Sequence, residues 1–175
     1  MTAIDTVFLN GTVGVGKSTV AEAIAGLEEA AHTPHAVIDL DFIRQYWPAP
    51  AHDPFNLELE LANLAAMAAN YRAAGAKRLI LAGVIERPHD VSRYVEATNA
   101  DGLMVARLTL DPAQAEERLR RRHAGDPEGL AWHLARFGEL SAVLDAAALD
   151  DVVVDTSGLS PVDVARQVRR AAGWL

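Results

Sequence analysis

Residues 11–18 read Gly-Thr-Val-Gly-Val-Gly-Lys-Ser and match the phosphate-binding pattern G-x-x-x-x-G-K-[S/T] at every fixed position. Glycines let backbone N–H groups turn toward an anion without a Cβ in the way. A lysine at position 17 brings positive charge to the β- and γ-phosphates of a nucleotide, and a serine hydroxyl at 18 is a ligand for Mg²⁺. We expect the following residues to bind ATP with Mg²⁺: Gly11, Thr12, Val13, Gly14, Val15, Gly16, Lys17, Ser18 and Thr19.

The segments on either side of this motif support the interpretation. Residues 7–9 (Val-Phe-Leu) are typical of a short buried strand, and Val20, Ile24 and Leu27 recur at helical spacing after the motif. A helix over residues 17–31 would point the positive end of its dipole at the same anion. The motif therefore stands between a strand and a helix, which is the context that separates it from a chance match.

A second group of charged residues follows the apolar segment 36–38. A hydroxyl that accepts a phosphoryl group needs a carboxylate to orient it and take its proton, and a cation to steady the migrating charge. Asp41 and Arg44 provide this pair, three residues apart, and Asp39 is placed to hold Mg²⁺ through its waters. The alternative is that Asp39 or Asp41 simply caps a helix that begins near Phe42.

Five apolar segments alternate with segments of helical periodicity, and this alternation predicts an α/β fold with a parallel sheet and right-handed crossovers. Continuous apolar strands are expected when helices cover both faces. Asp53-Pro54 has the form of a helix start, with Phe55 packed in the core. Ligands of such sheets bind at the carboxyl ends of the strands. Four segments therefore share one rim: residues 10–18, 39–44, 83–87 and 155–158.

The chain has 175 residues, which suits one domain spanning residues 1–175. Its formal net charge of −8 argues against a large polyanionic partner, so nucleic acid is not the expected ligand. Without cysteine there is no disulfide framework and no thiolate metal site. No apolar run is long enough for a membrane span, and the N-terminus does not read as a signal peptide. We expect a cytoplasmic monomer or homodimer.

Residues 11–18, the run Ile-Asp-Leu-Asp-Phe-Ile-Arg at 38–44 and the Trp-Pro at 47–48 together resemble the small P-loop kinases. These include adenylylsulfate, shikimate and gluconate kinases, chloramphenicol phosphotransferase, the zeta toxins and polynucleotide kinase. The resemblance implies a three-layer P-loop NTPase fold, a sheet ordered 2-3-1-4-5 and ATP-dependent phosphorylation of a hydroxyl. It also implies that Asp41 lies close to that hydroxyl. Zeta toxins differ, because they have a glutamate within the third strand, where this chain has Leu-Ala-Gly at 81–83.

The arginine-rich segment 118–122 falls where these kinases have their lid, here about residues 118–130. Arg118 and Arg122 are four residues apart and share one helix face. One could stack on adenine while the other contacts the transferring phosphate. The alternative is a solvated helix end, where arginines suit the negative end of the dipole. Residues 155–161 follow strand five, where the resemblance to these kinases implies a loop beside the adenine.

The acceptor site is predicted from fewer signals. Trp47, Tyr46 and Phe55 are candidates for the pocket wall, with core packing as the preferred alternative for Phe55. Arg87 could contact the acceptor, although Pro88 makes a turn an equal explanation. The leading hypothesis is a kinase for a small metabolite or an antibiotic-like acceptor, with Lys17, Asp41, Arg44 and Arg122 as catalytic residues. Two alternatives are a polynucleotide 5′-hydroxyl kinase and a P-loop ATPase or switch that acts through a protein partner.

Overall fold

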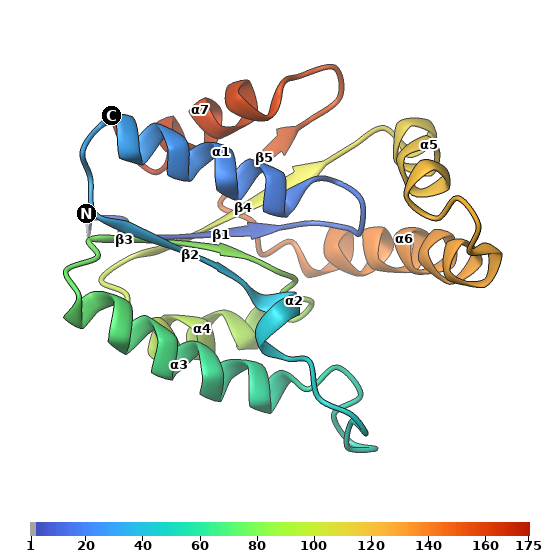
Figure 1. Cartoon of the computed structure of the whole chain (residues 1–175), viewed down its shortest axis with the longest axis horizontal. Helices are drawn as coiled ribbons and strands as arrows, with labels where there is room; N and C mark the ends of the chain where they lie inside the picture. The colour runs from blue at the N-terminus through green and yellow to red at the C-terminus, as the bar shows by residue number, and fades with distance from the viewer. Residues whose placement is uncertain (1–2) are drawn as a thin grey trace.

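The computed structural model describes residues 3–175 and contains a five-stranded sheet in the order β2-β3-β1-β4-β5 (Figure 1). All neighbouring strands are parallel. The order predicted from the sequence is confirmed. The strands are β1 (Thr6–Asn10), β2 (His35–Asp39), β3 (Arg78–Ala82), β4 (Leu103–Thr109) and β5 (Val152–Asp155).

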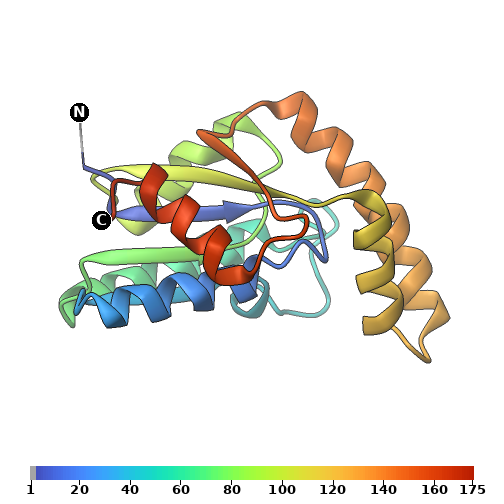
Figure 2. The same ribbon diagram turned by 90° about the horizontal axis from the view of Figure 1, so that it is seen from above.

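Helices cover both faces of the sheet (Figures 1 and 2). The helices α1 (Lys17–Ala30) and α7 (Pro161–Ala171) lie on one face, and α3 (Leu57–Ala73) and α4 (Val91–Thr98) lie on the other. Successive strand residues point to opposite faces. In β1, Val7 and Leu9 therefore pack in the cluster under α1 and α7, whereas Phe8 packs in the cluster with Leu64 and Tyr94. Burial on both faces explains the uninterrupted apolar strands.

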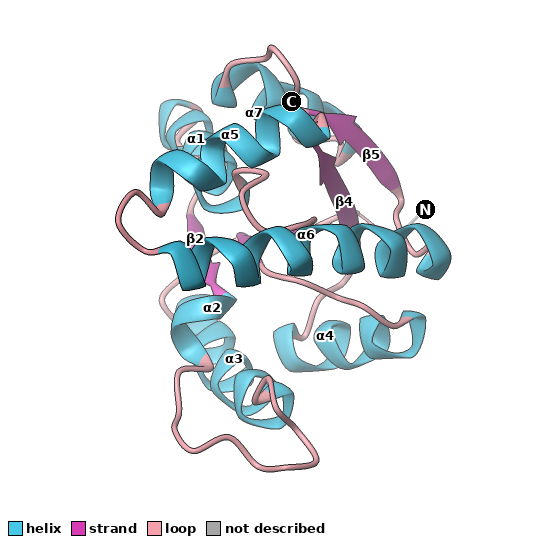
Figure 3. Cartoon of the chain, turned by 90° about the vertical axis from the view of Figure 1, so that its right-hand side faces the viewer, coloured by secondary structure: helices cyan, strands magenta, loops and turns pink. Residues whose placement is uncertain are grey.

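Four further elements follow strands at their carboxyl ends. The short helix α2 (Leu40–Ile43) follows β2, and a 3₁₀ turn, η1 (Pro88–Asp90), precedes α4. The helices α5 (Pro112–Arg122) and α6 (Pro127–Ala147) extend from the end of β4 and lie across the carboxyl edge of the sheet (Figures 1 and 3). The segment predicted as a lid thus includes the last turn of α5 and the start of α6.

The start of α3 differs from the sequence prediction. The helix begins at Leu57, not next to Pro54, and Asn56 precedes it in the left-handed conformation. Asp53 still caps the helix from outside, because its carboxylate accepts the N–H groups of Leu57 (2.8 Å) and Glu58 (3.0 Å). The prediction of Phe55 as a core residue is also wrong, since its side chain is 46% exposed.

A closed cluster of charges lies at the amino edge of the sheet. Glu28 of α1 is fully buried and pairs with Arg78 of β3 and Arg169 of α7, the latter at 2.6 Å. The Arg78 guanidinium also lies 4.7 Å from the ring centroid of Trp174. These contacts join α1, the sheet and the C-terminal segment. Within residues 3–175, no helix has both the length and the apolar character needed to cross a membrane.

Candidate functional site

Residues 11–16 form a tight loop between β1 and α1 that requires glycine at defined points, and Lys17 and Ser18 are the first residues of α1. Gly11 has φ 143°, and a Cβ at this position would lie 2.5 Å from the carbonyl oxygen of Leu108. Gly16, with φ 98°, is the residue at which the chain enters α1. Any larger residue would be strained at either position. The loop shape is therefore fixed by its neighbours and by the glycines together.

The side chain of Lys17 folds back over this loop. Its Nζ donates to the carbonyl oxygens of Gly11 (2.9 Å) and Thr12 (3.1 Å). Burial lowers the pKa of Lys17 to about 8, while the carboxylates of Asp41 and Asp39 act in the opposite direction. A phosphate next to this ammonium would favour its charged form. The loop, its backbone N–H donors and the Lys17 ammonium fit a nucleoside triphosphate.

Asp39 has two contacts, one on each carboxylate oxygen. Oδ2 accepts the hydroxyl hydrogen of Ser18 at 2.5 Å, and Oδ1 accepts the N–H of Asp41 at 3.1 Å and so caps α2. Capping and contact with the loop are thus combined in one side chain. Mg²⁺ is usually bound through one or two protein oxygens, with waters and phosphates completing its shell. Ser18 and Asp39 fit that requirement, and residues 3–175 contain no cluster of three or more His, Cys, Asp or Glu suited to a metal.

Asp41 and Arg44 lie together at the end of α2. The Arg44 Nη2 binds the Asp41 carboxylate, and Nη1 lies 3.3 Å from Oε2 of Glu60 in α3. Asp41 is 59% exposed, so its carboxylate keeps one side open to the cavity. The spacing predicted from the sequence therefore corresponds to a contact in the structure.

Glu60 is a site residue that the sequence analysis missed. Its side chain is only 1% exposed, and Oε1 accepts the hydroxyl hydrogen of Tyr94 at 2.5 Å. Burial raises the pKa of Glu60 to about 7, against the lowering effect of Tyr94 and Arg44. Burial also raises the pKa of the Tyr94 phenol above its usual value. The sequence did contain a signal, because a glutamate three residues after Leu57 and four before Leu64 lies on the buried stripe of α3.

One cavity of about 970 Å³ is lined by the phosphate-binding loop, Asp39, Asp41, Arg44 and Tyr94, whereas Glu60 lies beneath Arg44 and Tyr94. We define the donor wall as the phosphate-binding loop and Arg122, and the acceptor wall as the lining residues within 41–57, 84–94 and 132–140. The predicted residues Lys17, Asp39, Asp41, Arg44, Arg87 and Arg122 all line the cavity. Trp47 does not, and its side chain is 88% exposed.

A smaller pocket of about 240 Å³ adjoins the loop on its other side. It is lined by Val15, Gly16, Thr19 and Arg118 together with Thr156 and Leu159 after β5. Arg118 and Arg122, one helical turn apart, thus face two adjacent spaces. Within residues 3–175 neither makes an ion pair, whereas Arg120 and Arg121 pair with glutamates of α5.

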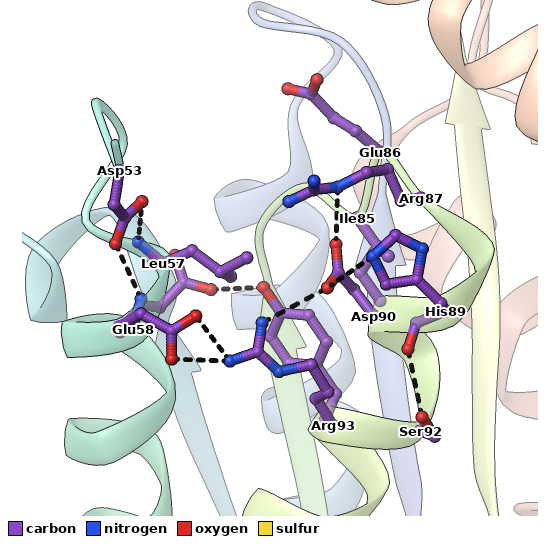
Figure 4. Close-up of polar contacts among 12 residues, drawn as sticks. Asp53, Leu57, Glu58, Ile85, Glu86, Arg87, His89, Asp90, Ser92 and Arg93 are labelled. Carbon is purple, nitrogen blue, oxygen red and sulfur yellow. Dashed lines mark hydrogen bonds and ion pairs between the residues drawn. The ribbon is translucent and has the colours of Figure 1, made fainter. Parts of the chain in front are cut away.

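Helix α6 contributes three further residues that the sequence analysis did not identify: Trp132, His133 and Arg136. The Arg136 guanidinium binds Glu86 and lies 5.1 Å from the ring centroid of Phe55. These contacts link α6 to the loops after β2 and β3. Figure 4 shows the neighbouring network, in which Asp90 lies between Arg87 and Arg93 and Arg93 reaches Glu58 of α3. No local sequence pattern marks these residues.

No protein-family model and no curated protein matches this sequence. Solved structures do match along nearly the whole chain. The tunicamycin resistance protein of Deinococcus radiodurans has a TM-score of 0.66 at 22% identity, covering 97% of this chain and 96% of that one. The fold is that of the small P-loop kinases. A gluconokinase of Sinorhizobium meliloti shares this fold with a TM-score of 0.59 at 20% identity, covering 96% of this chain and 91% of that one. A shikimate kinase of Bacteroides thetaiotaomicron also shares it, with a TM-score of 0.58 at 18% identity, covering 96% of this chain and 98% of that one.

Proposed function

We propose that this protein is an ATP-dependent kinase that transfers the γ-phosphoryl group to a hydroxyl of a small molecule. The observation that carries the proposal is that the phosphate-binding loop and the Asp41–Arg44 pair open on the same cavity. A loop that holds phosphates on one wall and a carboxylate–guanidinium pair on the other provides both sides of a phosphoryl transfer.

Asp41 is the residue that orients the acceptor hydroxyl and takes its proton. As the acceptor oxygen bonds to the γ-phosphorus, the bond from that phosphorus to the β–γ bridging oxygen breaks and ADP leaves with the electron pair. Arg44 and Arg122 offset the charge that spreads over the transferring group. Lys17 and the backbone N–H groups of the loop hold the β- and γ-phosphates.

Ser18 and Asp39 are the residues that would hold Mg²⁺, which when bound neutralises charge on the β- and γ-phosphate oxygens. The pocket formed by Arg118 and the segment after β5 is the space for adenine, because it adjoins the loop opposite the acceptor wall. The arginine side chain can stack on the base there.

The structural neighbours support a small-molecule acceptor. They are described as a tunicamycin resistance protein, a gluconokinase and a shikimate kinase. The acceptor of this chain is thus a metabolite or an antibiotic-like compound. The net charge of −8 favours such an acceptor over a polynucleotide.

An ADP-release screen over metabolites and antibiotics that carry hydroxyl groups, tunicamycin included, tests the proposal. Lys17→Ala should abolish turnover, because it removes the cation at the phosphates. Asp41→Asn should keep the Kd for ATP and lower kcat by about 10²- to 10⁴-fold, the usual contribution of a general base. Asp101→Asn, an exposed aspartate beside the amino end of β4, is the matched control.

Two results would contradict the assignment. Normal transfer by Asp41→Asn would remove the carboxylate from the reaction. Phosphorylation of a 5′-hydroxyl oligonucleotide alone, or ATP hydrolysis that ignores every acceptor and rises with a protein partner, would favour the two other functions.

A further inference from the structure

Each of the three arginines on the acceptor wall is already bound by a carboxylate of the protein. Arg44 pairs with Asp41 and Glu60, and Arg87 Nε lies 3.1 Å from Oδ2 of Asp90 (Figure 4). Arg136 pairs with Glu86 and, at 3.1 Å, with Glu139. In Arg44 and Arg136 both Nη atoms are bound, so the planar fork that would bind a ligand carboxylate in a bidentate manner is occupied, whereas Arg87 is held through Nε.

The charge of the acceptor wall also opposes an anionic acceptor. Four carboxylates line it (Asp41, Asp53, Glu86 and Asp90) against three guanidinium groups, which leaves a formal charge of 3 − 4 = −1. His52 and His133 complete its titratable groups and are charged only when protonated. At Arg44 and Arg136 a ligand carboxylate would have to displace a protein carboxylate from its arginine. At Arg87 it would bring a second negative charge next to Asp90, which is 5% exposed and also pairs with Arg93.

The same wall presents aromatic rings from three separate elements. Phe42 of α2, Phe55 of the following loop and Trp132 of α6 line the cavity with 73%, 46% and 56% of their surfaces exposed. The Arg136 guanidinium lies over the ring of Phe55. The rings of Trp132 and His133 are nearly perpendicular, with their centroids 4.8 Å apart. Partly exposed rings gathered around one cavity are typical of a site for a flat apolar group.

We propose that the acceptor is an uncharged hydroxyl compound that bears an aromatic or other planar apolar group, and that the site rejects carboxylates. The inference rests on the proposed kinase function. It separates the acceptor of this chain from shikimate and gluconate, which are carboxylate anions. Arg44 and Arg136 join separate protein segments, Arg87 holds the nearby Asp90, and the aromatic rings bind the acceptor.

The test uses matched compounds that differ only in a carboxylate or in a ring. Phenyl β-D-glucoside and phenyl β-D-glucuronide differ in charge, as do methyl shikimate and shikimate, whereas methyl β-D-glucoside lacks the aromatic ring. Binding is measured by calorimetry on Lys17→Ala, which cannot transfer phosphate but keeps the acceptor wall. We expect each neutral member of a charged pair to bind at least tenfold more tightly than its carboxylate partner, and the phenyl to bind more tightly than the methyl glucoside.

Variants test the cause. Glu86→Gln releases Nη2 of Arg136, whose Nη1 stays paired with Glu139, and should narrow the ratio of the two phenyl compounds' Kd values at least fivefold. Glu117→Gln, whose pair with Arg121 lies outside the cavity, should not change this ratio. Phe55→Ala and Trp132→Ala should weaken binding of the phenyl compounds and leave binding of methyl β-D-glucoside unchanged. Because both rings are partly exposed, thermal unfolding should change little.

Equal or tighter binding of the carboxylates, an unchanged ratio in Glu86→Gln, or no binding by any neutral probe would overturn the inference. The proposed function fails by a different result. Suppose that the wild-type protein transfers phosphate to no compound while Lys17→Ala still binds the neutral compounds more tightly than their carboxylate partners. The inferred ligand class would then be supported and the kinase assignment would be wrong.

Discussion

Two buried glutamates lie at opposite edges of the sheet and differ in what surrounds them. Glu28, at the amino edge, pairs with both Arg78 and Arg169, and within residues 3–175 neither arginine pairs with another carboxylate. Glu60, at the carboxyl edge, accepts from Tyr94 and shares Arg44 with Asp41. Both side chains are almost fully buried. Burial alone therefore does not distinguish a scaffold residue from a site residue.

The difference lies in how completely the charges are paired. The carboxylate of Glu28 meets two guanidinium groups, so nothing remains for a ligand. At the other edge the Glu60 pKa is raised to about 7, Lys17 donates to loop carbonyls, and Arg118 and Arg122 lack an ion pair within residues 3–175. Incomplete pairing together with a shifted pKa marks the functional edge.

Glu28→Ala should give the largest effect, on stability. This change removes the carboxylate of a buried cluster and leaves Arg78 and Arg169 without their ion-pair partner. The free energy of unfolding should therefore fall by about 3–5 kcal/mol. Below the unfolding temperature, kcat should be unchanged. Urea unfolding followed by circular dichroism measures this, with the exposed Glu22→Ala of the same helix as control. A loss of turnover without a loss of stability would place Glu28 in the functional site.

The two edges also differ in what the sequence reveals. The donor wall could be predicted because its loop is one contiguous segment whose glycines dictate its shape. Asp41 and Arg44 could be placed because they follow a strand, and the carboxyl ends of parallel strands share one edge. The sheet order followed from the resemblance, and the alternation of strands and helices followed from apolar periodicity.

The remaining acceptor wall could not be predicted from local patterns. Tyr94 of α4 and Arg136 of α6 line the cavity, and Glu60 of α3 contacts Tyr94; only tertiary packing brings these three residues together. The start of α3 was missed for a related reason: Asp53 satisfies two helix N–H groups from four and five residues away, without being the adjacent cap. Trp47 illustrates the converse, since a large aromatic residue near the site lies away from the cavity.

Arg122→Ala should have the next largest effect, confined to turnover. The side chain lines the cavity without an ion pair, so its removal leaves no protein charge stranded. Loss of one group that stabilises transition-state charge lowers kcat by about 10²-fold, or about 2.7 kcal/mol. Arg121→Ala, one position away and 72% exposed, is the control. Equal loss of turnover in both variants would indicate a general effect of α5 charge.

Glu60→Gln should have the smallest effect on turnover and a diagnostic dependence on pH. A neutral glutamine can still accept from Tyr94 but cannot pair with Arg44, which is then held by Asp41 alone. We expect kcat to fall about tenfold, which corresponds to about 1.4 kcal/mol. Glu58→Gln on the same helix, 67% exposed and paired with Arg93, is the control.

The stability of the Glu60 variant separates the two edges most sharply. Because the pKa of Glu60 is raised to about 7 from 4.5, the folded protein binds more protons than the unfolded chain between these values. This group's stabilising contribution is therefore complete below pH 4.5 and is lost as the pH rises through 7. Glutamine does not titrate, so the unfolding free energy of Glu60→Gln relative to wild type should increase from pH 5 to about pH 7 and level off by pH 8. A difference that stays constant over this range would mean that Glu60 is as fully paired as Glu28, and the contrast between the two edges would then rest on Lys17 and the lid arginines alone.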